Sequence, residues 1–114
     1  MAALTPIPLS RAGADISTLA TAGAGGDTFP AGSATYLRIK NGNAAVCTPT
    51  FTPPAGGGKY GTTVAPWIPA SVAATTGDKV FGPFPAETWA DANGNVNVTY
   101  SVTATVSVQV LQAV

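Results

Sequence analysis

The 114-residue chain has no histidine, one cysteine and few charged residues. Without histidine, a hydrolytic triad of the usual Ser-His-Asp kind is excluded. Cys47 has no second cysteine with which to form a disulfide inside the chain, and between apolar neighbours it is expected to be a buried small hydrophobic residue. The sequence therefore offers little of the side-chain chemistry that most enzymes use, and we expect no enzymatic activity.

Charge is scarce as well as balanced. Five basic and five acidic residues give a formal net charge of zero, and 9% of the residues are charged, against about 25% in ordinary soluble domains. Neither nucleic acid nor an anionic membrane surface is therefore an expected partner. A folded domain of this size has a surface of about 5,700 Å². Ten charged side chains on that surface leave room for uncharged patches of about 800 Å², which is the area that each partner buries in a standard interface. We expect a protein that works in an assembly.

The chain also lacks a long apolar run. No segment has the length of a membrane helix, and the opening residues MAALTPIPLSRAG have prolines where the apolar core of a signal peptide would lie. We therefore expect synthesis in a cytoplasm, and use there or in a particle assembled there. Pro6 and Pro8 exclude a helix near the N-terminus. We predict an extended arm over residues 1–14 and one domain over residues 15–114.

The most regular pattern lies near the C-terminus. From Val96 to Val110, valine, tyrosine or alanine occupies every second position and polar residues occupy the others. This period of two is typical of strands with one buried and one wet face. One strand over the whole stretch would be about 50 Å long, too long for a domain of this size. We predict a hairpin with a three-residue loop at residues 101–103, which places Tyr100 opposite Ala104.

Shorter strands separated by turn signals are predicted in the rest of the chain. The clearest is 34–40, with Leu37 and Ile39 facing inward. Pro49 favours an edge position for the strand that contains it. Weaker candidates are strands at 15–20, 45–51, 60–64, 68–73 and 79–81, and a helical turn at 85–90. About eight short strands of this kind predict an all-β fold, an antiparallel β-sandwich of jelly-roll or immunoglobulin-like type.

Two loops resemble ligand sites. Asp91, Asn93 and Asn95 have the spacing of a calcium loop, but the sixth position is Val96 where glycine belongs. The run GGGK at residues 56–59 is similar to a phosphate loop, but tyrosine follows the lysine where serine or threonine would hold magnesium. We interpret the first as a turn and the second as a solvated loop. No metal site and no cofactor is expected.

The candidate contact residues are apolar. Trp67 and Trp89 could stack on sugars, but aromatic residues next to proline more often pack at sheet corners or anchor a protein interface. The apolar residues of the arm are too few to fold alone, so we expect the arm to be disordered when free and ordered against a partner. Arg11 would pair with an acidic partner surface. The predicted interface residues are Leu4, Ile7, Leu9, Arg11, Trp67 and Trp89.

Several segments in order resemble a known group of proteins. They are LTPIPLSRAG, then GGDTFPAG before YLRIKNG, then GDKVFGPFPAETWADANGNVNVTYS and a closing valine-rich strand. They are similar to small proteins encoded beside the major capsid protein in tailed bacteriophages, particularly phages of actinobacteria, which are regarded as capsid decoration (cement) proteins or minor head proteins.

The resemblance implies a function as well as a fold. A protein of this kind is β-rich, binds the outer surface of the expanded capsid in the virion, often as a trimer, and stabilises the shell against the pressure of the packaged DNA. It would be made in the host cytoplasm, with the major capsid protein as its partner and no catalytic residue. The alternative is a carbohydrate-binding module on the head or tail surface that uses Trp67 and Trp89.

Overall fold

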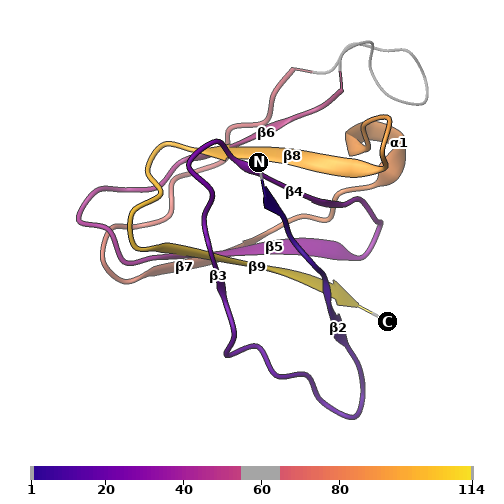
Figure 1. Cartoon of the computed structure of the whole chain (residues 1–114), viewed down its shortest axis with the longest axis horizontal. Coiled ribbons are helices and arrows are strands. Elements are labelled where there is room, and N and C mark those ends of the chain that lie inside the picture. Colours follow the sequence, from indigo (N-terminus) through magenta and orange to yellow (C-terminus); the bar gives the residue numbers. More distant parts are fainter. Residues whose placement is uncertain (1, 55–64, 114) are drawn as a thin grey trace.

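The computed structural model describes residues 2–54 and 65–113, which form two β-sheets packed face to face (Figure 1). The strands are β1 (Ala2–Ala3), β2 (Ile7–Leu9), β3 (Ala20–Thr21), β4 (Asp27–Pro30), β5 (Thr35–Asn41), β6 (Pro49–Thr52), β7 (Gly77–Phe81), β8 (Asn95–Tyr100) and β9 (Val106–Ala113). One helical turn, α1 (Ala86–Trp89), precedes β8. The predicted all-β sandwich is confirmed.

The order of the strands separates the two topologies that the sequence left open. One sheet has the order β1-β4-β8-β6, and the other has the order β2-β9-β5-β7 with β3 also paired to β9. From β4 to β9, each strand lies in the opposite sheet from the strand before it. In an immunoglobulin-like sandwich, several successive strands lie in the same sheet. The crossing connections here are those of a jelly roll.

Strand β5 confirms the clearest local prediction. Leu37 and Ile39 are fully buried, while Arg38 and Lys40 between and beside them face outward. The strand pairs with β7 on one side and β9 on the other, both antiparallel. Its central position buries one face against the opposite sheet, which is why its alternation was readable from the sequence.

The valine pattern predicted the buried face correctly and the hairpin wrongly. Val98 and Val106 are fully buried, as are the other valines of β8 and the first half of β9. The two strands nevertheless lie in different sheets, so residues 101–105 cross between sheets instead of forming a hairpin loop. Tyr100 lies opposite Pro49, not opposite Ala104. Alternation specifies which face is buried and leaves the partner strand open.

Other predicted elements are shorter than expected. The predicted strand at 15–20 is reduced to β3. The predicted strand at 45–51 begins only at Pro49, as β6. Strand β6 is the last strand in the order β1-β4-β8-β6, in agreement with the edge position that Pro49 favoured. The stretch 68–73 contributes one isolated bridge, Cys47↔Val72. The helical turn at 85–90 is confirmed by α1. The predicted strand at 60–64 lies outside the described residues.

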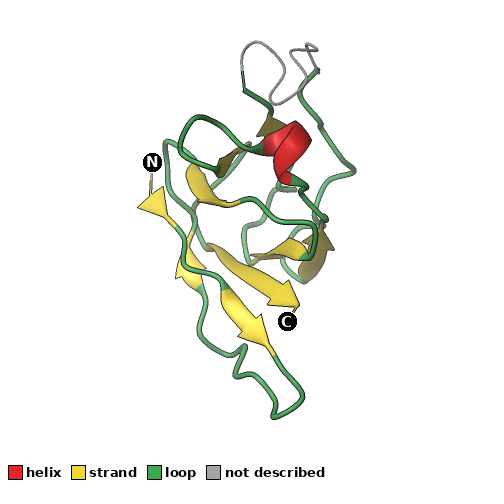
Figure 2. Cartoon of the chain, turned by 90° about the vertical axis from the view of Figure 1, so that its right-hand side faces the viewer, coloured by secondary structure: helices red, strands yellow, loops and turns green. Residues whose placement is uncertain are grey.

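The N-terminal arm packs on its own domain. Strand β1 pairs in parallel with β4, and β2 pairs in parallel with β9, so the arm passes from one sheet to the other along the side of the sandwich (Figure 2). The backbone N–H of Leu4 donates to Thr28 O at 2.8 Å. The arm thus covers strand edges that would otherwise be unpaired. The sequence predicted an arm that becomes ordered only against a partner. In this structure the arm is instead ordered against β4 and β9 of its own chain.

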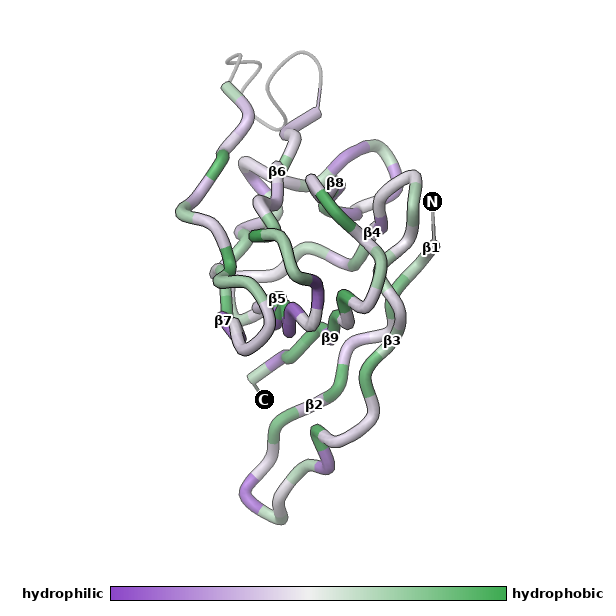
Figure 3. Tube along the Cα trace, turned by 90° about the vertical axis from the view of Figure 1, so that its left-hand side faces the viewer, coloured by the Kyte–Doolittle hydropathy of each residue, from purple (hydrophilic) through white to green (hydrophobic). Residues whose placement is uncertain are grey.

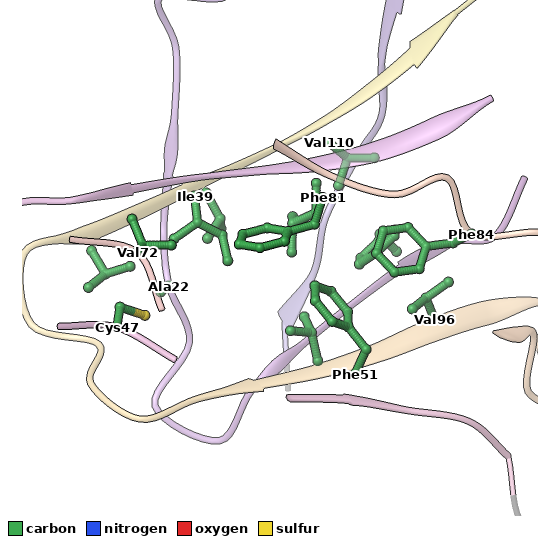
Figure 4. Packing of buried hydrophobic residues seen from close by; sticks show 14 residues of the cluster. Ala22, Ile39, Cys47, Phe51, Val72, Phe81, Phe84, Val96 and Val110 are labelled. Carbon is green, nitrogen blue, oxygen red and sulfur yellow. The ribbon is translucent and has the colours of Figure 1, made fainter. Parts of the chain in front are cut away.

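Aromatic and aliphatic side chains from both sheets fill the space between them (Figure 4). Phe51 and Phe84 are fully buried and their ring centroids lie 4.7 Å apart. Cys47 is also fully buried, at the other end of the labelled cluster near Val72 and Ala22. Burial raises the pKa of the Cys47 thiol. The interpretation of Cys47 as a small hydrophobic core residue is confirmed.

Candidate functional site: an aromatic edge

The fold brings together the two tryptophans that the sequence singled out. Their ring centroids are 6.3 Å apart and their planes are inclined by 51°. Trp67 lies on a segment that forms an isolated β-bridge with Phe51 of β6. The backbone N–H of Trp67 donates to the backbone oxygen of Phe51, and the backbone oxygen of Trp67 accepts from the backbone N–H of Phe51, both at 2.9 Å. Trp89 is the last residue of α1. Because α1 lies beside β8, and β8 pairs with β6, residues distant in sequence share one edge of the sandwich.

The corner before α1 holds this arrangement in place. Gly82 has φ +137°, and a Cβ there would lie 2.9 Å from the carbonyl oxygen of Thr35, so the position requires glycine. The chain then turns inward to bury Phe84, whose carbonyl accepts from Gly32 N at 2.8 Å. Pro85 precedes the helical turn with a φ of −59°, which suits the start of a helix. The local sequence GPFP thus sets the position of Trp89.

Both tryptophans are supported by rings of the core. Trp67 stacks on Phe51 with centroids 5.2 Å apart and planes 27° apart. Trp89 meets Phe84 edge-on at 5.7 Å. We call the set Phe51, Trp67, Phe81, Phe84 and Trp89 the aromatic edge. Each such pair adds about 0.5–1.5 kcal/mol beyond area burial, so the exposed ring is held on a rigid base.

The exposed part of the aromatic edge is apolar. Trp67 is 38% exposed and the next residue, Ile68, is 61% exposed. One face of the Trp67 ring is covered by Phe51, and Trp89 is only half-exposed. The edge therefore presents an anchored indole and an aliphatic side chain, which is the chemistry of a protein-contact anchor. A flat sugar platform needs ring faces that are more open than these.

The predicted arm residues lie on a different surface. Leu4, Ile7 and Leu9 are half-buried along β4 and β9, and Leu4 packs against the core. Ile7 lies opposite Leu111 in the parallel ladder. Arg11 is exposed in the turn that follows β2. The structure thus divides the predicted interface residues between the arm and the aromatic edge.

The loop that resembled a calcium site is a turn. The carboxylate of Asp91 accepts from the backbone N–H groups of Asn93 at 2.8 Å and Asn95 at 3.1 Å, and from Asn97 Nδ2 at 3.0 Å. The bond from Asn97, followed by those from the backbone, holds the pKa of Asp91 below its usual range. Gly94 has φ +80° at the tip. These contacts occupy the acidic oxygens within the protein.

Two wider observations concern the described parts of the chain. Among residues 2–54 and 65–113, His, Cys, Asp and Glu side chains form no group of three that could hold a metal ion. No helix in those ranges is long and apolar enough to cross a bilayer. The GGGK run at 56–59 lies outside the described residues.

A buried polar pair was missed in the sequence. Asp27 is fully buried, and its Oδ2 accepts from the Tyr100 hydroxyl at 2.7 Å and from Gly23 N at 3.1 Å. Its Oδ1 has no hydrogen-bond partner among the described residues. Burial, then the bond to Asp27, raises the pKa of Tyr100. Asp27 sits in a glycine-rich stretch that looked like a loop, so its burial gave no sequence signal.

A second polar group, also missed, holds the chain between β2 and β3. Arg38 donates to both carboxylate oxygens of Asp78, at 3.0 and 2.8 Å, and to Ile16 O at 3.2 Å. Gln109 Nε2 donates to Ile16 O at 2.9 Å and to Thr18 O at 3.0 Å. We call Arg38 and Gln109 the clamp. Arg38 also holds the pKa of Asp78 below its usual range.

Comparison with known proteins gave no relatives. A scan against protein-family models, a search of curated proteins and a search of solved structures each returned no match to this chain.

Proposed function

We propose that this protein is a structural component of a tailed-phage virion, a decoration protein that binds the outer capsid surface and cements the shell. Its partner is the major capsid protein, and it acts as a trimer. The phage assignment rests on the resemblance of residues 4–13, 25–32, 36–42 and 77–101, and of the closing valine-rich strand, to proteins of that kind.

The aromatic edge is the structural feature that supports the proposed contact with the capsid. An exposed tryptophan with a rigid base loses little conformational freedom when a partner covers it, so its burial yields more affinity than that of a mobile side chain. Trp67 has such a base in Phe51, and Ile68 beside it is the most exposed of the large hydrophobic residues in the described chain. A cement protein needs contacts of this kind because the shell offers a large fixed surface.

Carbohydrate binding is the second candidate. The observation in its favour is that Trp67 and Trp89 lie side by side at 6.3 Å. The inclination of 51° and the covered face of Trp67 argue against a continuous platform. Saturable binding of the isolated protein to a glycan array would favour this second function over the first.

The test is co-sedimentation with empty shells assembled from the major capsid protein of the phage that encodes this chain, as the proposal requires. Wild-type protein is expected to saturate the shells and to raise their melting temperature. Ile68→Asp places a charge next to Trp67 of the aromatic edge without removing a core contact, because Ile68 is 61% exposed. We expect it to weaken binding at least about tenfold, which corresponds to about 1.4 kcal/mol.

Val80→Asp is the matched control. Val80 is 54% exposed on β7, where it lies opposite Arg38 of β5, so the same charge is added at a similarly exposed aliphatic position that is not next to Trp67 or Trp89 in the sequence. It should bind shells as the wild type does. Equal loss in both variants would remove the aromatic edge from the proposal, and no binding by the wild type would overturn the capsid function itself.

A further inference from the structure

The part of the N-terminal arm that pairs with the sandwich, residues 2–9, is held by few contacts. Two ladder pairs join β1 to β4, three join β2 to β9, and one backbone hydrogen bond joins Leu4 to Thr28. Its three large apolar side chains, Leu4, Ile7 and Leu9, are each only half-buried. The arm therefore forms a specific but small contact with the sandwich.

A hollow separates part of the arm from the strands beside it. Its volume is about 560 Å³, and it lies between residues 3–7 on one side, residues 15–20 on another, and Val108–Val110 of β9. The hollow exists because two short strands share one edge of β9. Strand β3 pairs antiparallel with Ser107 and Val108, and β2 pairs in parallel from Leu111 onward. Between these two pairings, Gln109 and Val110 have no strand partner among the described residues on this side of β9.

The chain beyond the arm is fixed to the domain. The clamp residues Arg38 and Gln109 hold the carbonyl of Ile16, and Gln109 also holds that of Thr18. Gln109 is 4% exposed, and its two bonds are partly shielded from water. Ser17 bonds to Asp15 through both its N–H and its hydroxyl. The segment from residue 15 onward therefore stays in place if the arm leaves.

The connection between the arm and the clamp is suited to act as a hinge. The chain from β2 to β3 projects beyond the sheets (Figures 1 and 3). The reversal at its start is closed by one local bond, Gly13 N to Ser10 O at 3.0 Å. Gly13 has φ +96° and nothing lies within 4 Å of where its Cβ would be. Opening this turn breaks no contact with the core.

We propose that the arm exchanges between copies of this chain, so that β1 and β2 of one copy pair with β4 and β9 of its partner. Every contact of the arm in the single chain can form between two chains, because the arm and its seat are the same in each copy. Exchange then costs only the hinge turn and the entropy of association. The partner supplies two strands that complete both sheets. Arm exchange does not depend on the proposed capsid partner.

Disulfide trapping between differently tagged chains tests the exchange. Leu9 and Ala113 are register neighbours in the parallel ladder, a spacing that a disulfide can bridge. In a Cys47→Ala background, chains with Leu9→Cys are incubated with chains with Ala113→Cys and then oxidised. Residues in one complex meet at millimolar effective concentration, so at about 100 µM protein the mixed disulfide should form about tenfold faster than by random collision.

The control pair lies on strands that cannot exchange without unfolding. Thr50 and Thr99 are register neighbours in β6 and β8, and chains with Thr50→Cys or Thr99→Cys measure random collision. A second arm pair, Ala3→Cys with Thr28→Cys, repeats the test at β1 if Leu9→Cys disturbs β2. Faster mixed cross-linking at an arm pair than at the control pair supports exchange. Equal rates at both arm pairs and the control would overturn it.

Discussion

At the scale of single residues, the hydrogen bond between buried Asp27 and Tyr100 gives a direct test of what stabilises the fold. Asp27 is a fully buried acidic residue whose hydrogen-bond donors are the Tyr100 hydroxyl and the backbone N–H of Gly23. A buried acceptor that loses its donor costs about 1–3 kcal/mol. The Tyr100 hydroxyl therefore stabilises the fold by keeping Asp27 partnered.

Replacing Tyr100 tests this pair and its pH dependence. Tyr100→Phe should lower the free energy of unfolding by about 1–3 kcal/mol at neutral pH, measured by urea denaturation. The pKa of Tyr100 is raised in the folded state by burial and by Asp27. Its contribution is therefore fully present below the unfolded pKa of about 10 and is lost as pH rises above that value.

The difference between wild type and Tyr100→Phe should thus shrink in the alkaline range. Tyr36→Phe is the matched control, because the half-buried Tyr36 makes no side-chain hydrogen bond to the described residues. It should change stability little. A Tyr100→Phe difference that stays constant from neutral to strongly alkaline pH would contradict the assignment.

Sequence reasoning at this scale succeeded where a residue is apolar and failed where it is polar. Cys47, Leu37 and Ile39 were predicted to be buried because hydrophobicity and alternation are local properties. The burial of Asp27 and Gln109 depends on partners more than 70 residues away along the chain, Tyr100 and Ile16. Such pairing leaves no local pattern. The same is true of the contact between Trp67 and Trp89, whose residue types were noticed and whose meeting was not.

At the scale of elements, β8 and β9 show what periodicity contains. The pattern fixed the inward faces correctly, and a charge at Val106 can test them. Val106 is fully buried, so Val106→Asp should destabilise the fold by about 3–5 kcal/mol through an unpaired buried charge. Thr105→Asp should be mild, because Thr105 is exposed and its φ of +56° suits aspartate better than a β-branched residue.

Thermal melts of the two variants give the comparison. A large loss in melting temperature for Val106→Asp beside a small change for Thr105→Asp is the expected result. Similar tolerance of both would mean that the inward face is assigned wrongly. The strand partner, in contrast, was not predictable from this stretch. A hairpin and a crossing connection both need a short polar segment, and both keep the valines inward.

The arm is the second element whose role the structure changes. The sequence predicted an arm that is disordered when free, and removal of such an arm would leave the isolated domain nearly unaffected. Because the arm pairs with β4 and β9 and half-buries three apolar side chains, deletion of residues 2–9 should lower the free energy of unfolding by about 1–3 kcal/mol, net of the entropy of ordering.

Chemical denaturation of the truncated and full-length chains measures this effect. A chain that lacks residues 2–9 should also have a smaller denaturant slope, because less surface is buried on folding. An unchanged unfolding midpoint would indicate that the arm does not occupy its own domain in solution. Full loss of folding would show that the arm contributes more than its half-buried contacts suggest.

At the scale of the whole molecule, charge is unevenly placed. Strands β5 and β7 carry Arg38, Lys40, Asp78 and Lys79, and Arg38 and Asp78 form an ion pair at 2.8 Å. Strands β4, β6 and β8 contain two ionisable side chains, those of Asp27 and Tyr100, and Asp27 is fully buried. The exposed positions of those three strands are threonine and proline, and Asn95 and Asn97 are half-buried. One sheet therefore has a charged outer face and the other an uncharged one.

This distribution leads to a prediction about salt. Binding to shells, if it uses the aromatic edge and uncharged surface, depends on burying apolar area and not on ion pairs. Between about 0.1 M and about 1 M salt the Debye length falls from about 10 Å to about 3 Å, which removes most attraction between exposed charges. Apolar association is unaffected or strengthened by the same change. Shell binding measured by co-sedimentation should therefore persist at high salt with no loss of affinity. Arm exchange pairs backbone groups and apolar side chains, so it should also persist at high salt.

Release of the protein from shells in high salt would instead place the contact on the charged face of β5 and β7. In that case Arg38→Gln or Lys40→Gln would weaken shell binding, and Ile68→Asp would not.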